Sequence, residues 1–289
     1  MGSLLSAYVR LTKPTIVLLF AVTGLAAVVM EGSLLADPLK LCLVMLAMVL
    51  TAGSANALNM YFDRDIDARM ARTREKRPIP LAQVEPARAA MFGLVLGAAA
   101  IGYYLWATNV LTAFLSLFTI VFYVGIYTLW LKRRTPYNIV IGGVAGSTAP
   151  LIGWAASGGG IATVAWVMFL IVFLWTPPHF WSLAIAIQDD YREAGVPMLP
   201  VTHGDRRTRI EILIYTLLLL PVSLLPWFLG RSGMVFLVGA ALSGAFYLWR
   251  TVSLLREATR PAAKKLFWIS ILWLFALFAL LFADTLLRA

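Results

Sequence analysis

Residues 39–67 read LKLCLVMLAMVLTAGSANALNMYFDRDID, an apolar run that ends in an asparagine and three aspartates. About 20 apolar residues are enough for one helix to cross the ~30 Å hydrocarbon core of a bilayer. The whole chain is 61% hydrophobic and 13% charged, against roughly 45–50% and 25% in a soluble domain. The bilayer is therefore the expected solvent for this fold.

Comparable apolar runs recur along the chain, and turn residues such as Ser157-Gly-Gly-Gly separate them. The pattern predicts an all-α, polytopic membrane protein with about nine transmembrane helices. The expected spans are 15–30, 39–58, 88–107, 110–130, 137–156, 162–186, 210–229, 233–252 and 266–286. A single domain, 1–289, is expected, with two weakly related helical halves at about 1–135 and 136–289. Each half presents an acidic segment to a shared central cavity that opens to the cytoplasmic side.

Basic residues set the expected topology. Of the 24 Lys and Arg residues, all but Lys40, Arg231 and Arg288 fall on one side of the predicted membrane. By the positive-inside rule the N-terminus and the acidic segments are cytoplasmic, and an odd number of helices puts the C-terminus outside. The basic residues form no single patch for nucleic acid. The chain is thus expected in a bacterial inner membrane, as a multi-pass protein whose active site faces the cytoplasm.

The first acidic segment carries the chemistry. Asn59, Asp63 and Asp67 are spaced i, i+4, i+8 and line one face of a helix, whereas Asp65 falls on another face. Their oxygens are suitable ligands for Mg²⁺, whose coordination shell is commonly completed by substrate phosphates. Arg residues just downstream suit phosphate recognition. The alternative is a solvated helix end whose charges pair loosely at the membrane surface.

A second acidic segment, Gln188 to Pro200, contains Asp189, Asp190 and Glu193. Two carboxylate groups on one cavity could hold metal ions on opposite sides of a diphosphate and neutralise its charge as it leaves. Which of the three residues binds metal stays open, and an interfacial loop without metal is the alternative. His179 lies in an apolar segment beside Pro177 and Pro178, where a substrate contact and a hydrogen-bonded structural histidine are about equally supported.

Three strings carry a resemblance. Asn59-x3-Asp63-x3-Asp67, with Arg69-x2-Arg72-Thr-x3-Arg77-Pro after it and the second acidic segment, resembles the intramembrane UbiA-type prenyltransferase superfamily. Thr176-Pro-Pro-His-Phe-Trp181 and Asp190-Tyr-Arg-Glu-Ala-Gly-Val-Pro-Met-Leu-Pro200 are similar to its branch that farnesylates protohaem IX. The superfamily's second motif is usually Asp-x3-Asp, from which Asp189, Asp190 and Glu193 depart.

The resemblance implies a helical bundle around a central cavity, Mg²⁺ as cofactor, and farnesyl diphosphate and haem B as substrates. A haem-modifying enzyme or terminal oxidase assembly would receive the product. The catalytic residues it implies are Asp63, Asp67, Arg72 and Arg77. The implied substrate contacts are Asn59, Arg72, Lys76, Arg77, His179, Tyr191 and Arg192. The implied metal ligands are Asn59, Asp63, Asp67, Asp189, Asp190 and Glu193.

Two other functions fit part of the pattern. A prenyltransferase for an aromatic acid or quinone precursor would use the same metal site. A transporter or lipid-diphosphate carrier would also use paired acidic segments, but it needs access from both sides of the membrane. The predicted outer loops hold few charged residues, Glu31, Asp37, Lys40 and Arg231 among them, which argues against a through path.

Overall fold

A computed structural model describes residues 4–288, which form helices and no strand. Nine helical spans in this part of the chain are long and apolar enough to cross a membrane, so the predicted all-α class and span number are confirmed. The spans are α2 (Pro14–Glu31), α3 (Pro38–Phe62), α6 (Pro86–Ala107), α7 with η2 (Val110–Val121 and Phe122–Leu131), α8 with α9 (Asn138–Ser147 and Ala149–Gly158), α10 (Thr163–Ala186), α12 (Leu199–Phe228), α13 (Met234–Glu257) and α14 (Arg260–Arg288).

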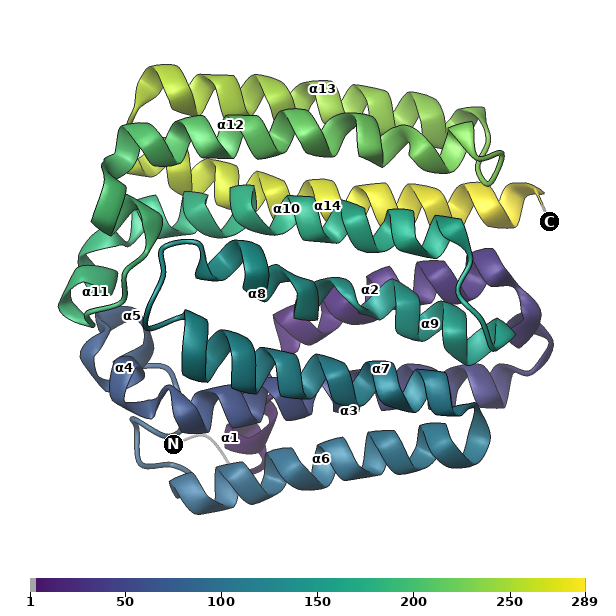
Figure 1. Cartoon of the computed structure of the whole chain (residues 1–289), viewed down its shortest axis with the longest axis horizontal. Helices are drawn as coiled ribbons and strands as arrows, with labels where there is room; N and C mark the ends of the chain where they lie inside the picture. The colour runs from purple at the N-terminus through teal and green to yellow at the C-terminus, as the bar shows by residue number, and fades with distance from the viewer. Residues whose placement is uncertain (1–3, 289) are drawn as a thin grey trace.

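Short helices connect the spans. Three of them, α4 (Arg64–Arg69), α5 (Ala71–Arg74) and α11 (Gln188–Glu193), gather at one end of the bundle (Figure 1). The first described helix, α1 (Leu4–Leu11), lies beside α3, and η1 (Ser33–Ala36) connects α2 to α3. The two acidic segments therefore meet at the same end of the molecule.

Local sequence fixes where the helices begin. Proline stands at the first positions of α2, α3 and α6, where its missing N–H costs no hydrogen bond. Asp37 caps α3 by accepting the Lys40 N–H at 3.0 Å, and Asn109 caps α7 by accepting the Thr112 N–H at 2.9 Å. These signals place the helix starts within a few residues of the predicted ones.

The centre of the bundle is the α8–α9 span, which runs beside α2 between the α3–α7 and α10–α14 rows (Figure 1). Within its most apolar window 78% of the residues are buried, against 28% for the peripheral helix α6. α10 continues unbroken through Pro177 and Pro178, both buried. Proline removes a backbone hydrogen bond and is expected to break a helix, but no break occurs here and α10 continues to Ala186.

Candidate active site

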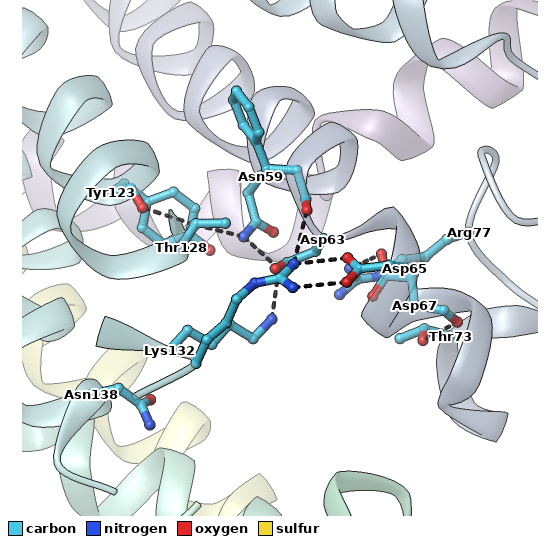
Figure 2. A network of polar contacts seen from close by, with 12 residues as sticks. Asn59, Asp63, Asp65, Asp67, Thr73, Arg77, Tyr123, Thr128, Lys132 and Asn138 are labelled. Carbon is cyan, nitrogen blue, oxygen red and sulfur yellow. Dashed lines mark hydrogen bonds and ion pairs between the residues drawn. The ribbon is translucent and has the colours of Figure 1, made fainter. Parts of the chain in front are cut away.

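The first motif consists of Asn59, Asp63 and Asp67 of the first acidic segment. Its amide and two carboxylates lie along one face where α3 meets α4. The N–H groups of Asp63 and Asp67 donate to the carbonyls of Asn59 and Asp63 at 2.9 and 2.8 Å, so the i, i+4 relation continues across the junction. Asn59, Asp63 and Asp67 are 2%, 0% and 1% exposed. Figure 2 shows the three side chains close together. A buried charge needs a partner.

Basic side chains from three elements provide those partners. Lys132, just after η2, places its Nζ 2.6 Å from Asp63 Oδ2, and Arg77 pairs with Asp67. Lys13 donates from Nζ to Asn59 Oδ1 at 2.6 Å. Figure 2 shows Lys132 and Arg77 approaching the carboxylates from different sides. Two buried carboxylates thus stand among three basic groups, an arrangement that leaves capacity for a bound anion.

Lys13 is held in an unusual conformation. It precedes α2 with φ 55° and ψ 72°, in the left-handed region, which costs a non-glycine residue about 1–3 kcal/mol. Burial lowers the pKa of Lys13 well below its ordinary value, and Arg77 acts in the same direction. An anion bound beside it would favour the charged form. A strained backbone that aims an amine at a buried amide is typical of a functional position.

Asp65 lies on another face, as its spacing predicts. It is exposed and accepts two hydrogen bonds from Arg133, both at 2.7 Å. Arg133 also donates to the carbonyl of Phe62 at 3.2 Å. Hydrogen bonding to Arg133 lowers the pKa of Asp65 to about 2. This pair connects the α3–α4 junction to the end of η2, directly beside the Lys132–Asp63 contact.

The remaining predicted substrate contacts separate into two groups. Arg72, Arg77 and Tyr191 line one cavity together with Asn59 and Asp67. Burial raises the pKa of Tyr191, so its hydroxyl remains a hydrogen-bond donor. Lys76 and Arg192 are exposed and do not line this cavity. The structure therefore brings together only part of the predicted set.

The second acidic segment is arranged differently from the first. Asp189 is exposed and pairs with Arg260 at 2.6 Å and with Arg192 at 2.9 Å, and its pKa is lowered chiefly by the Arg260 hydrogen bond. Asp190 accepts the backbone N–H of Arg72 at 3.1 Å. Glu193 is exposed. None of these three carboxylates lines the cavity, so metal binding by this segment stays a prediction, with Asp190 nearest to the first motif.

The cavity has a volume of about 480 Å³, within the roughly 300–1,000 Å³ of small-molecule sites. Its polar lining includes Lys13, Asn59, Asp67, Arg72, Arg77 and Lys132. The rest is apolar and aromatic, with Tyr123, Tyr127 and Trp175 among the lining residues. Tyr123 and Tyr127 stack with their ring centroids 5.3 Å apart. Such a site suits a ligand with an anionic head and an apolar body.

His179 lies in the aromatic part of this cavity. Its ring stacks on Trp175 and Phe267, with centroids 4.2 and 4.6 Å apart, and its Nδ1 lies 2.8 Å from Ser270 Oγ. Trp175 donates to the Ser270 carbonyl at 2.8 Å. The ring is therefore both fixed by α14 and part of the cavity wall, which combines the structural and the substrate-contact interpretations.

The first motif also fits a divalent metal ion by its chemistry. Asn59, Asp63 and Asp67 offer hard oxygen donors, and Asp63 Oδ1 is buried without a partner among the described residues. In the same part of the chain, no three His, Cys, Asp or Glu residues form a metal-binding group. Protein carboxylates alone would leave the coordination shell incomplete, as is usual where substrate phosphates and waters supply the remaining ligands.

Sequence reasoning missed three members of this site. Lys13 and Lys132 were considered only as topology-setting charges, and Thr128 was not considered. Thr128 Oγ1 accepts from Asn59 Nδ2 at 2.9 Å and donates to the Tyr123 carbonyl at 2.8 Å (Figure 2). The available signal was that both lysines stand at the ends of apolar runs. A charged side chain at such a membrane boundary can reach into the helical bundle.

Comparison with known sequences gives the family directly. Residues 17–286 match the UbiA prenyltransferase family. The chain is 46% identical over 287 residues to a protoheme IX farnesyltransferase of Symbiobacterium thermophilum, covering 98% of this chain and 95% of that protein. It is 45% identical over 286 residues to a protein of the same name from Gloeobacter violaceus, covering 99% and 93%.

Solved structures share the fold. A digeranylgeranylglyceryl phosphate synthase superposes with a TM-score of 0.79 at 20% identity, over 98% of each chain. A UbiA homolog from Archaeoglobus fulgidus bound to GPP and Mg²⁺ superposes with a TM-score of 0.67 at 13% identity, over 95% of this chain and 99% of that chain. With a family match over nearly its full length and relatives at about 45% identity, the chain belongs to the UbiA prenyltransferase family.

Proposed function

We propose that this chain transfers a farnesyl group from farnesyl diphosphate to a vinyl group of haem B, with addition of water, to give haem O and diphosphate. The observation that carries the proposal is the cavity with one basic end and one aromatic end. The name shared by relatives at about 45% identity supports the choice of donor and acceptor.

The basic end suits the diphosphate. Arg72 of α5, Arg77 in the turn after α5 and Lys132 just after η2 line it, and Lys13 joins them from the residue before α2. Arg groups bind phosphate oxygens in a bidentate manner, whereas Lys acts as a point charge. As the bond between farnesyl C1 and the diphosphate oxygen breaks, the electron pair stays on oxygen. The four basic groups stabilise the charge that develops there.

Asn59, Asp63 and Asp67 would hold the metal ion that this family implies. A bound Mg²⁺ would supply Lewis-acid stabilisation of the leaving diphosphate. Support comes from the unpartnered Asp63 Oδ1 and from the Mg²⁺ bound to a structural relative. Asp190 orients the Arg72 backbone through its hydrogen bond, which links the second acidic segment to the same end of the cavity.

The aromatic part suits the prenyl chain and the porphyrin. Tyr123 and Tyr127 lie between the basic end and the deeper cavity, where their rings would stabilise the allylic farnesyl cation by cation–π attraction. The vinyl π electrons attack C1, and water adds to the resulting cation with loss of a proton. His179, fixed by Ser270, would contact the haem edge. No residue forms a covalent intermediate, so catalysis rests on positioning and electrostatics.

The proposed location is the bacterial inner membrane, with the polar end of the cavity on the cytoplasmic side. Nearly all basic residues lie toward that end of the predicted topology, which supports this orientation. Haem O would then pass to a haem-modifying enzyme or a terminal oxidase.

Incubation of purified protein with Mg²⁺, haem B and farnesyl diphosphate tests the proposal. Mass analysis of the extracted pigment is expected to show one farnesyl group and one water added. Asp63→Ala should abolish the product, whereas Glu85→Ala, an exposed carboxylate at the start of α6, should not. Unmodified pigment from the wild-type protein would refute the haem assignment, and full activity of Asp63→Ala would refute the role of the first motif.

A further inference from the structure

Two long helices, α3 and α10, line the cavity over only part of their length. On α3 the lining residues run from Asn59 to Ala52, and on α10 from Leu183 to Val172. These runs span seven and eleven positions, about 10 Å and about 16 Å at the rise of an α-helix. Ala52 and Val172 therefore mark the end of the cavity that is farthest from the basic groups.

One turn beyond, each helix carries a methionine on the same face. Met48 precedes Ala52 by four positions, and Met168 precedes Val172 by four positions. Both are 0% exposed, and neither lines the cavity. Each methionine thus lies one turn past the last lining residue of its helix.

Met48 reaches across from α3 to α2. A Cβ added to Gly24 of α2 would collide with the Met48 terminal methyl and would lie 3.2 Å from the Ala149 carbonyl of α9. Gly24 therefore provides the space into which the end of Met48 fits. Methionine is unbranched and fills irregular gaps, so shortening this side chain would open space directly beneath Ala52.

We propose that Met48 and Met168 form the floor of the cavity and set the length of the prenyl donor that the protein accepts. The proposal rests on the proposed function, because it assigns the apolar depth of the cavity to the prenyl chain. A donor one isoprene unit longer must displace a packed methionine, and a shorter one leaves apolar space unfilled. Both effects favour a single chain length.

A competition experiment measures this preference. Purified protein receives Mg²⁺, haem B and an equimolar mixture of geranyl, farnesyl and geranylgeranyl diphosphates, and the haem products are separated by mass. In Met48→Ala and Met168→Ala, the geranylgeranyl-to-farnesyl product ratio should rise at least tenfold over wild type. In Ala52→Phe, which fills the deep end, the geranyl-to-farnesyl ratio should rise at least tenfold.

Met60→Ala is the matched control. Met60 is also on α3 and 4% exposed, but it packs with α1 and does not line the cavity. The same truncation there should leave both ratios unchanged. Met48→Val, a smaller truncation, should give an intermediate shift and serves if Met48→Ala does not fold.

A second measurement separates this proposal from the haem assignment. Stabilisation of each variant by the three diphosphates, with Mg²⁺ and without haem, should follow the same order as the product ratios. If wild type leaves haem unmodified but the variants still change donor preference, the floor stands and the acceptor assignment fails. If wild type makes haem O while all three variants keep wild-type ratios, the floor proposal is overturned and the function stands.

Discussion

Asp63 is the residue on which most contacts of the site converge. Its Oδ2 accepts from both Lys132 and Asn59, at 2.6 and 2.8 Å, and its side chain is fully buried. A buried ion is tolerated only when it is paired and hydrogen-bonded, because desolvation costs several kcal/mol. The Asn59 amide is fixed at the same time by Thr128. Replacing any one of these groups therefore disturbs the others.

We predict that Asp63→Asn, which keeps the shape but removes the charge, lowers kcat for farnesyl transfer by at least about 10²-fold, a size typical of a lost electrostatic group. It should also destabilise the protein by about 3–5 kcal/mol, because Lys132 is left buried without a counter-ion. The double variant with Lys132→Met should recover stability but not activity. Thermal unfolding and product formation measure the two effects separately, and recovery of activity would contradict the role assigned to Asp63.

Lys13 should affect donor binding more than haem binding. We predict that Lys13→Gln raises the KM for farnesyl diphosphate about tenfold, equivalent to about 1.4 kcal/mol, and leaves the KM for haem B unchanged. Lys40→Gln at the opposite end of the molecule is the control, since Lys40 is far along α3 from Asn59. Equal changes in both KM values would show that Lys13 acts on the fold rather than on the diphosphate.

At the residue scale, the sequence predicted which residues form the first motif better than it predicted the side chains that they contact. The spacing of Asn59, Asp63 and Asp67 follows from helix periodicity, so their common line could be predicted. Lys13 and Lys132 are far from this motif in sequence, and their contacts depend on how α2 and η2 pack against α3. The pairing of Asp189 with Arg260 depends in the same way on α14. Long-range ion pairs therefore needed the structure.

Among the elements, η2 has the most direct effect on the site. Phe122–Leu131 forms a π-helix, in which each backbone hydrogen bond spans five residues instead of the four of an α-helix. Thr128 donates to the carbonyl five residues earlier, and the Lys132 N–H donates to the carbonyl of Tyr127 at 2.9 Å. This register directs Thr128 and Lys132 to the α3 motif. The apolar sequence of this segment fits an ordinary helix equally well, so the π register was not predicted.

The Asp65–Arg133 pair should hold η2 against the α3–α4 junction. We predict that Asp65→Arg lowers activity by about tenfold through like-charge repulsion with Arg133, and that the swap Asp65→Arg with Arg133→Asp restores most of it. The pair Glu85 and Arg88, exposed and remote, gives the matched swap with no effect. If the charge swap of Asp65 and Arg133 does not restore activity, the positioning role of this pair is contradicted.

The same pair should respond to pH in one direction. Arg133 holds the folded-state pKa of Asp65 at about 2, below its usual value of about 3.9. Its stabilising contribution is therefore present above about pH 4 and is lost as the pH falls toward 2. Both side chains are partly exposed, so salt should weaken the contact.

The whole molecule is organised by charge along one axis. The short helices α4, α5 and α11 gather at one end, whereas α14 finishes at the other (Figure 1). Asp67, Arg72 and Tyr191 of these short helices line the cavity. The apolar runs predicted the number of spans, and the distribution of basic residues predicted that both acidic segments lie at the same end. Both patterns could be read because they extend over the whole chain. The hydropathy pattern did not predict the helical segment that begins at Leu199, which a kink at Gly204, with a φ of 79°, separates from the rest of α12. The sequence predicts this span only over 210–229.

The topology can be measured with single cysteines. Cys42 is the only cysteine, so Cys42→Ala gives a background without thiols. In that background we predict that Gly160→Cys, in the exposed turn between α9 and α10, reacts with a membrane-impermeant maleimide on intact spheroplasts. Arg134→Cys, exposed beyond η2 at the opposite end of the bundle, should react only after lysis. The span between these positions, α8 with α9, crosses the membrane once, so the two sites must differ. Labelling of position 134 in intact spheroplasts, with position 160 protected, would reverse the orientation and place the basic end of the cavity outside, against the bias of the charges.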